Sequence, residues 1–147
     1  LFPYTTLFRS IDELRSLFEK LGKNPSIADG FITEFGFNLS IGDDFDAGCG
    51  LKIIDCNEVS IGNNVTIGEN VGIYTSNHAK DPKLRCDHWC SELPIRIGNN
   101  VVIESNSVVL PGTIIEDNVW IRPGSVVLGR IEADSICAGD PARRESK

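Results

Sequence analysis

The sequence has no methionine, an excess of acidic over basic residues and no long apolar run, and each of these limits what the chain can be. Its 14 Lys and Arg face 21 Asp and Glu, and the net charge of −7 argues against nucleic acid or an anionic membrane as the main partner. No apolar run approaches the roughly 20 residues of a membrane-spanning helix. Because an intact product should begin with methionine, we expect the 147 residues to belong to a longer chain.

The first ten residues are unlike a secretory leader, because Pro3, Tyr4 and Arg9 interrupt the apolar run. They resemble the translation of a sequencing-adapter oligonucleotide. We therefore expect residues 1–10 to be an artefact and leave them out of the fold prediction.

One helical pattern follows, over residues 11–23. Its apolar residues recur at helical spacing, Ser10 and Glu13 have the spacing of a capping box, and Gly22 is the stop signal. All seven Phe precede residue 46, which indicates a change of architecture near residue 40. We therefore assign residues 11–40 to an N-terminal helix and a lead-in. The apolar positions of the helix are Ile11, Leu14, Leu17, Phe18 and Leu21.

From residue 41 to 138 the chain repeats every six residues, each hexad beginning with Ile, Val or Ala. The fourth position is occupied by residues that accept turn or left-handed backbone geometry. Each hexad is thus a short strand and a corner, and three hexads form one coil of a triangular prism, with the lead residue inside. About four and a half coils are expected. The fourth-position residues are Asp44, Asn64, Asn70, Ser76, Asn100, Asn106, Gly112, Asn118 and Gly124.

One interruption leaves the repeat in phase. Ile73 and Ile97 are 24 residues apart, a multiple of six, so a loop over residues 79–94 can leave the coil without disturbing the register. Residues 139–147 are expected to be a C-terminal tail.

Several motifs resemble those of the hexapeptide-repeat acyltransferases: the hexads, Leu-Pro-Gly at 110–112, Pro-Gly-Ser-Val-Val at 123–127 and Ala-Gly-Asp-Pro-Ala-Arg at 138–143. Residues 35–42, Ile54-Asp55 and residues 73–78 resemble the maltose/galactoside O-acetyltransferase branch. The resemblance covers residues 11–145. It implies a left-handed parallel β-helix, a homotrimer with sites between subunits, and direct transfer of acetyl from acetyl-CoA to a hydroxyl of a sugar or similar small alcohol. It also implies that residues 11–40 retain only part of a longer N-terminal segment.

His78 matches the catalytic histidine of that branch. An imidazole that titrates near neutrality suits the removal of a hydroxyl proton, although a lone histidine here would be read as a surface residue. For acetyl-CoA, the resemblance assigns the oxyanion-binding amide to Ser105, the strip beside the pantetheine arm to Pro123 and Gly124, and the 3′-phosphate end to Arg143. Arg143 has the alternative of being a solvated tail charge.

The donor and acceptor sides both depart from the family pattern. Val102 replaces a Trp, Glu104 and Arg122 replace corner glycines, and Gly48 stands where the family has an acceptor-contacting Asn. Asp55 and Glu34 are assigned to the acceptor. For Asp55, orienting His78 or serving a corner turn remain alternatives.

Five cysteines, an odd number, favour a reducing, cytoplasmic compartment. Cys86, His88 and Cys90 lie near His78, but Cys-x-His-x-Cys is not a common zinc spacing, and we expect no metal. A zinc hydratase like the γ-class carbonic anhydrases needs three His ligands, whereas the chain has two His. The remaining alternative to the enzyme is a catalytically silent β-helix that acts as a structural or assembly subunit.

Overall fold

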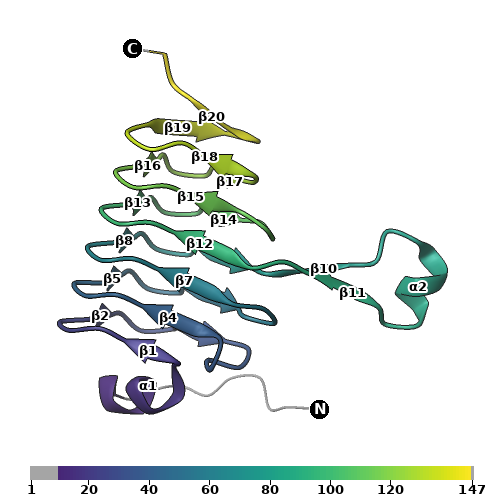
Figure 1. The fold of residues 1–147 in the computed structure, drawn as a ribbon, viewed down its shortest axis with the longest axis horizontal. Helices are drawn as coiled ribbons and strands as arrows, with labels where there is room; N and C mark the ends of the chain where they lie inside the picture. Colours follow the sequence, from purple (N-terminus) through teal and green to yellow (C-terminus); the bar gives the residue numbers. More distant parts are fainter. Residues whose placement is uncertain (1–9, 147) are drawn as a thin grey trace.

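The lead residues of successive hexads stack on one another and build a triangular β-solenoid of about six coils (Figure 1). The computed structural model describes residues 10–146. The predicted artefact at residues 1–10 lies, apart from Ser10, outside the described residues. Within residues 10–146 no helix is long and apolar enough to cross a membrane.

Three sheets form the faces of the prism, with parallel strands, one from each coil, except for the added antiparallel strand β20 in sheet B. Sheet A consists of β1 (Lys20–Leu21), β4 (Leu39–Ile41), β7 (Val59–Ile61), β12 (Ile95–Ile97), β15 (Ile114–Ile115) and β18 (Arg130–Ile131). Sheet B consists of β2 (Ser26–Ile27), β5 (Asp46–Ala47), β8 (Thr66–Ile67), β13 (Val102–Ile103), β16 (Trp120–Ile121), β19 (Ile136–Gly139) and β20 (Ala142–Arg144). Sheet C consists of β3 (Ile32–Thr33), β6 (Lys52–Ile54), β9 (Gly72–Tyr74), β14 (Val108–Val109) and β17 (Val126–Val127).

The solenoid begins earlier than residue 41. Helix α1 (Ile11–Leu17) starts as predicted, with the Ser10 hydroxyl accepting from the Glu13 N–H at 3.2 Å, but it ends well before Gly22. Lys20 and Leu21 instead pair with Ser40 and Ile41. The predicted lead-in over residues 11–40 therefore contains the first coil, and the expected four and a half coils become about six.

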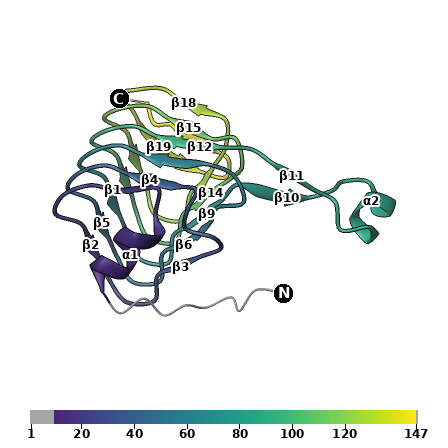
Figure 2. The ribbon, with the colours of Figure 1, turned by 60° about the horizontal axis from the view of Figure 1, so that its bottom comes forward.

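The helical prediction extended too far because the same apolar residues are buried in either conformation. Leu14, Phe18 and Leu21 are all buried, and the ring centroids of Phe18 and Phe31 lie 5.8 Å apart. Helix α1 lies over the end of the first coil (Figure 2) and covers an apolar interior that would otherwise face water.

The corners use the predicted backbone geometry. Eight of the nine predicted fourth-position residues have positive φ; Ser76 is the exception, because a hairpin leaves the coil there. At the corner between sheets A and B, side chains of neighbouring coils also form a hydrogen-bonded ladder in two runs, from Asn24 to Asp44 and from Asn64 to Asp134. Its members are Asn24, Asp44, Asn64, Asn100, Asn118 and Asp134.

The three corners differ in length. Corners A–B and B–C always place successive lead residues six apart, as from Ile97 to Ile103 to Val109. At corner C–A the spacing between successive lead residues varies from coil to coil. It is eight residues from Thr33 to Ile41, eight from Ile53 to Ile61, twenty-four from Ile73 to Ile97, six from Val109 to Ile115 and four from Val127 to Ile131. All variation in coil length is thus confined to one edge of the prism.

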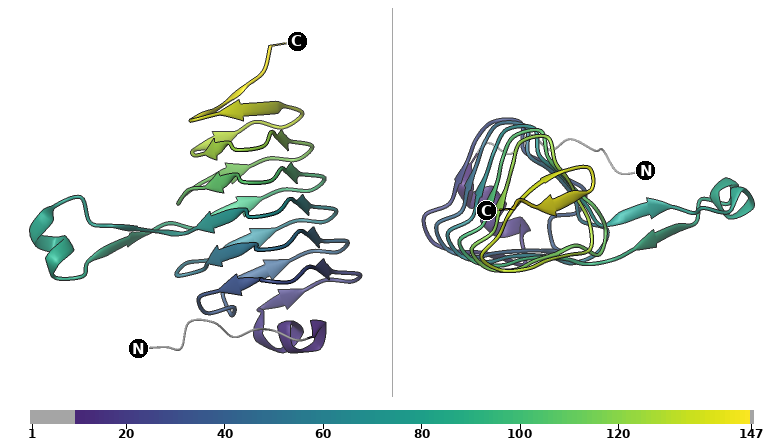
Figure 3. Two further views of the ribbon diagram at one scale, coloured as in Figure 1. Left: turned by 180° about the vertical axis from the view of Figure 1, so that it is seen from behind. Right: turned by 90° about the horizontal axis from the view of Figure 1, so that it is seen from above.

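The longest insertion is a hairpin that projects away from this edge (Figure 3). Strands β10 (Ser76–His78) and β11 (Cys90–Glu92) pair antiparallel and lead to helix α2 (Pro82–Cys86) at the tip. The excursion predicted over residues 79–94 therefore starts at Ser76. At the C-terminal end, the predicted tail folds back, since β20 pairs antiparallel with β19.

Candidate functional site

His78 lies on the exposed stem of the hairpin, where it is in register with Cys90. The stem continues the backbone of sheet C outward, because Leu93 N–H donates to the Thr75 carbonyl at 2.8 Å. Thr75 is itself buried and donates to the carbonyl of Ile54 at 2.8 Å. The imidazole is therefore carried by a stem that is anchored in the solenoid.

A hollow of about 830 Å³ opens beside His78. Local hydrogen bonds hold the tip of the hairpin together. The Asp81 carboxylate accepts from the Lys83 N–H at 2.7 Å and caps α2, and Arg85 donates to the Ala79 carbonyl at 3.0 Å. The apolar side chains that line the hollow are exposed: Trp89 is 62% exposed and Leu84 is 46% exposed. An apolar surface of this kind on a projecting arm is suited to contact with another molecule.

Asp55 is fully buried, and its carboxylate is occupied by the turn at residues 33–36. One oxygen accepts from Thr33 Oγ1 at 2.7 Å, Glu34 N–H at 3.1 Å and Phe35 N–H at 2.9 Å; the other accepts from Gly36 N–H at 2.8 Å. The corner-turn alternative fits these contacts, and direct acceptor binding does not, because no carboxylate surface is left exposed.

Sequence reasoning missed the surroundings of Glu34. Burial raises the pKa of the Cys56 thiol, a hydrogen bond with Ser76 opposes this shift, and the charges of Glu92 and Glu34 add to it. Ser76 and Glu92 are in register at the root of the hairpin, and the Cys56 thiol is hydrogen-bonded with Ser76, so these residues meet at corner C–A, the corner that also contains Glu34. No motif marks this group, because its members come from three separate coil segments.

Ser105 lies at corner B–C, one coil below Pro123 and Gly124. Its hydroxyl accepts from Glu69 N–H at 3.0 Å, and its carbonyl accepts from Gly124 N–H at 3.0 Å, while its own N–H finds no acceptor within residues 10–146. A Cβ on Gly68 would lie 2.5 Å from that nitrogen, so glycine keeps the amide accessible. The groove here, about 190 Å³, is also lined by Thr66, Val102, Ile103 and Glu104.

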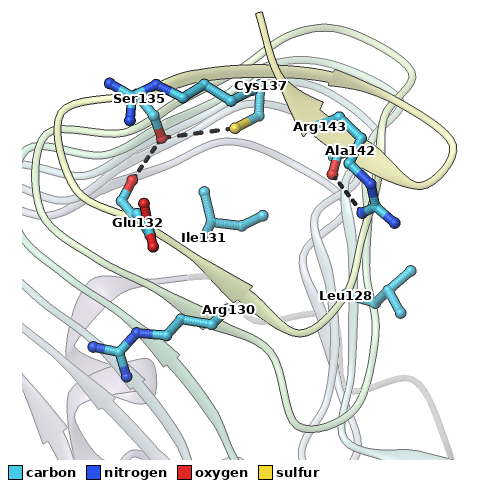
Figure 4. A pocket seen from close by; sticks show the side chains of 9 residues that line it. Leu128, Arg130, Ile131, Glu132, Ser135, Cys137, Ala142 and Arg143 are labelled. Atoms are coloured by element: carbon cyan, nitrogen blue, oxygen red, sulfur yellow. Dashed lines mark hydrogen bonds between the residues drawn. The ribbon is translucent and has the colours of Figure 1, made fainter.

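Arg143 borders a hollow of about 210 Å³ at the C-terminal end of the prism (Figure 4). Its guanidinium donates only to the carbonyl of Ala142, at 3.1 Å, among the described residues. Arg130 in the same hollow is paired with Glu116, and Arg144 donates to the Asp134 carbonyl at 3.2 Å. Arg143 and Arg144 therefore have no carboxylate partner in residues 10–146, and Arg143 bonds only the carbonyl of its neighbour.

The substituted donor-side positions contact one another. Trp120 is in register with Val102, its indole N–H donates to Glu104 at 2.6 Å, and Arg122 lies over its ring at 5.9 Å. Arg122 also pairs with Glu145 at 3.3 Å. The aromatic side chain absent at Val102 is therefore present one coil further on.

The predicted site residues fall into three places. His78, Glu34 and Asp55 lie at corner C–A, Ser105 with Pro123 and Gly124 at corner B–C, and Arg143 at the C-terminal end. The hollow beside His78 and the groove beside Ser105 share no residue. A single chain therefore does not bring the histidine and the serine amide together.

The cysteines offer no metal centre of their own. All five are free thiols, and among residues 10–146 no three His, Cys, Asp or Glu side chains are grouped so that they could hold a metal ion.

Comparison with known proteins places the repeat in a described family. The profile "Bacterial transferase hexapeptide (six repeats)" matches residues 94–129, and "Hexapeptide repeat of succinyl-transferase" matches residues 58–76. The galactoside O-acetyltransferase of Escherichia coli (strain K12) is 36% identical over 130 residues, 88% of this chain and 64% of that protein. The chain thus spans less than two thirds of that relative's length.

Two solved structures are closely similar. A maltose O-acetyltransferase from Clostridium difficile 630 superposes with a TM-score of 0.89 at 33% identity, over 98% of this chain and 79% of that one. A galactoside acetyltransferase in complex with coenzyme A superposes with a TM-score of 0.89 at 34% identity, over 95% of this chain and 72% of that one.

Proposed function

The chain belongs to the hexapeptide-repeat acetyltransferases of the galactoside and maltose type, and we propose that it transfers acetyl from acetyl-CoA to a hydroxyl of a sugar or similar small alcohol. The observation that carries the proposal is His78, exposed beside an open hollow on a stem that the solenoid anchors. A base in this position is what an alcohol acceptor requires.

When bound, acetyl-CoA supplies a thioester whose acyl carbon an alcohol can attack. His78 takes the proton of the acceptor hydroxyl as the new C–O bond forms, and returns it to the departing sulfur as the C–S bond breaks. The free N–H of Ser105 donates to the thioester oxygen as negative charge develops there. No nucleophilic Ser or Cys is needed, and the remaining contribution of the protein is positioning.

The donor residues suit this cofactor. A Cβ on Gly124 would meet no atom within 4 Å, so the backbone beside Pro123 is open to an extended arm. Arg143 has a guanidinium available for a phosphate.

The site requires a second copy of the chain. Because His78 and Ser105 lie at different corners of one prism, we propose a homotrimer in which each hairpin reaches the B–C corner of a neighbour. The exposed Trp89 and Leu84 give the hairpin the apolar surface for that contact. Five free thiols support a reducing, cytoplasmic compartment.

On the acceptor side we propose that Glu34 contacts the sugar, together with the neighbouring Cys56 and Glu92. Asp55 acts through Glu34, because it bonds the Glu34 N–H and holds the turn that presents this side chain. Asp55 is therefore a positioning residue.

The test is CoA release from acetyl-CoA with a panel of mono- and disaccharides. Release is measured by chromatography, because five cysteines would react with a thiol reagent. We expect acceptor-dependent release and three chains per particle in sedimentation. If no acceptor supports release and calorimetry detects no acetyl-CoA binding, the enzyme assignment fails, and the catalytically silent subunit takes its place.

A further inference from the structure

A second groove, of about 500 Å³, runs along sheet A near corner C–A and is separate from the hollow beside His78. It crosses β4 and β7, where the central residues Ser40 and Ser60 are in register. The side chains that the argument uses are Glu19, Phe37, Asn38, Ser40, Glu58 and Ser60.

One wall of the groove is an exposed aromatic ring on a rigid support. Phe37 is 57% exposed, the most exposed phenylalanine of the described chain. It follows Gly36, whose N–H is bonded to the Asp55 carboxylate, and precedes Asn38, whose side-chain amide donates to the Asp55 carbonyl at 2.7 Å. Phe35 supports the ring, with centroids 5.3 Å apart. The backbone on both sides of the exposed ring is therefore anchored to Asp55.

The polar groups of the groove are unengaged. Within residues 10–146, no hydrogen bond or ion pair involves the carboxylate of Glu19 or Glu58, or the hydroxyl of Ser40 or Ser60. Unlike Asp43 and Asp117, which accept from backbone N–H groups at 2.8 and 2.7 Å, these two carboxylates are free to accept from a ligand. The groove thus combines two free carboxylates with an exposed aromatic ring.

This combination has the chemistry of carbohydrate recognition. A flat ring accepts the apolar C–H face of a sugar, and carboxylates and hydroxyls bond the hydroxyl groups at its rim. Two carboxylates oppose a ligand of negative charge. We propose that the groove binds a neutral or cationic sugar unit that belongs to the acceptor of the reaction, an inference that rests on the proposed function.

The position of the groove relative to His78 sets the size of that acceptor. Ile95 N–H donates to the Glu58 carbonyl at 3.0 Å, so the groove ends at the root of the hairpin. From Ile95 back to Cys90, the register partner of His78, five extended residues span about 17 Å. A monosaccharide is too short for this span. The acceptor is therefore an oligosaccharide or a glycoside with a sugar at some distance from the reacting hydroxyl.

The experiment compares kcat/KM for glucose and for three neutral trisaccharides, the α-1,4-glucose, β-1,4-glucose and β-1,4-N-acetylglucosamine trimers. In the unmodified chain at least one trimer should exceed glucose. Phe37→Ala should lower the trimer-to-monosaccharide ratio about tenfold, the size expected for one lost ring contact. Ile114→Ala, which removes an exposed apolar side chain higher on sheet A and outside the groove, should leave the ratio unchanged. Glu58→Gln should improve use of a trigalacturonate, whose negative charge the native carboxylates oppose.

Direct binding separates this inference from the proposed function. Saturation-transfer NMR of the same trimers is measured without acetyl-CoA. Binding that Phe37→Ala abolishes supports the groove even if no acceptor is turned over. Absence of binding by every trimer, or an unchanged ratio in Phe37→Ala, overturns the groove even if monosaccharides are acetylated.

Discussion

Corners A–B and B–C of the prism never change length, whereas corner C–A ranges from four to twenty-four residues between lead positions. The left-handed Asn and Asp residues lie at the two constant corners, and A–B adds side-chain hydrogen bonds between coils. The variable corner contains Glu34, Asp55 and the hairpin with His78. The constant corners thus determine the register, and the variable corner supplies most of the candidate chemistry.

The difference has a simple physical basis. A parallel ladder requires each strand to return in phase, so the constant corners tolerate no slip. At the third corner an insertion can leave the coil, and loop-closure entropy grows only slowly with its length. Functional side chains can therefore be added at that edge at small cost to the stack.

The largest effect is expected at the variable corner, in activity. His78→Asn should lower turnover by about 10²- to 10⁴-fold because the proton acceptor is lost. His88→Asn is the matched control, the second histidine of the same hairpin, at a positive φ that Asn accepts. Steady-state CoA release measures both variants. Equal turnover in the two would remove His78 from the mechanism.

Insertions test the comparison itself. Two residues added after Gly129, at corner C–A, should change the free energy of unfolding by about 0.6 kcal/mol or less, the cost of a modestly longer loop. The same insertion after Asn100, at corner A–B, should cost more than about 2 kcal/mol because it breaks the ladder bonds to Asn64 and Asn118. Urea denaturation gives both values, and similar losses would contradict the division between corners.

The Asp55 turn provides a smaller effect at the variable corner. Asp55→Asn should lower the free energy of unfolding by about 1–3 kcal/mol, because an amide NH₂ then faces buried N–H donors. Asp46→Asn, at an exposed position on β5, should change it by less than about 0.5 kcal/mol. Thermal unfolding of the two variants measures the difference; an Asp55→Asn variant as stable as Asp46→Asn would contradict the role of the carboxylate in holding the turn.

The smallest effect concerns Cys56. Burial raises the pKa of its thiol, so a smaller fraction is thiolate near neutral pH, and its alkylation should be slower than that of an exposed thiol by a few-fold. In the folded protein the alkylation rate of Cys56 should therefore level off at a more alkaline pH than it does in the protein unfolded by urea. Mass spectrometry after iodoacetamide treatment, from pH 7 to 10, measures each site separately. Coincident folded and urea profiles would argue against the buried environment.

Much of the fold was accessible from residue order. The six-residue period and the turn-forming fourth position predicted the coils from residue 41 onward, and the 24-residue gap predicted the excursion. The first coil was missed because Leu14, Phe18 and Leu21 satisfy helical spacing as well as burial in a solenoid. Periodicity identifies which residues are buried, but does not by itself distinguish two backbones that bury the same set.

The candidate site likewise has a part that the sequence predicts and a part that only the tertiary structure shows. The resemblance of short local motifs to a known family identified His78, Ser105 and Arg143 as candidates, because each lies in a motif of consecutive residues. Only the tertiary structure showed that Asp55 is occupied by a turn, that Cys56 and Glu92 gather near Glu34, and that Phe37 and Glu58 share a groove. These groupings join residues about twenty or more positions apart, and coil stacking, not sequence proximity, decides which of them meet.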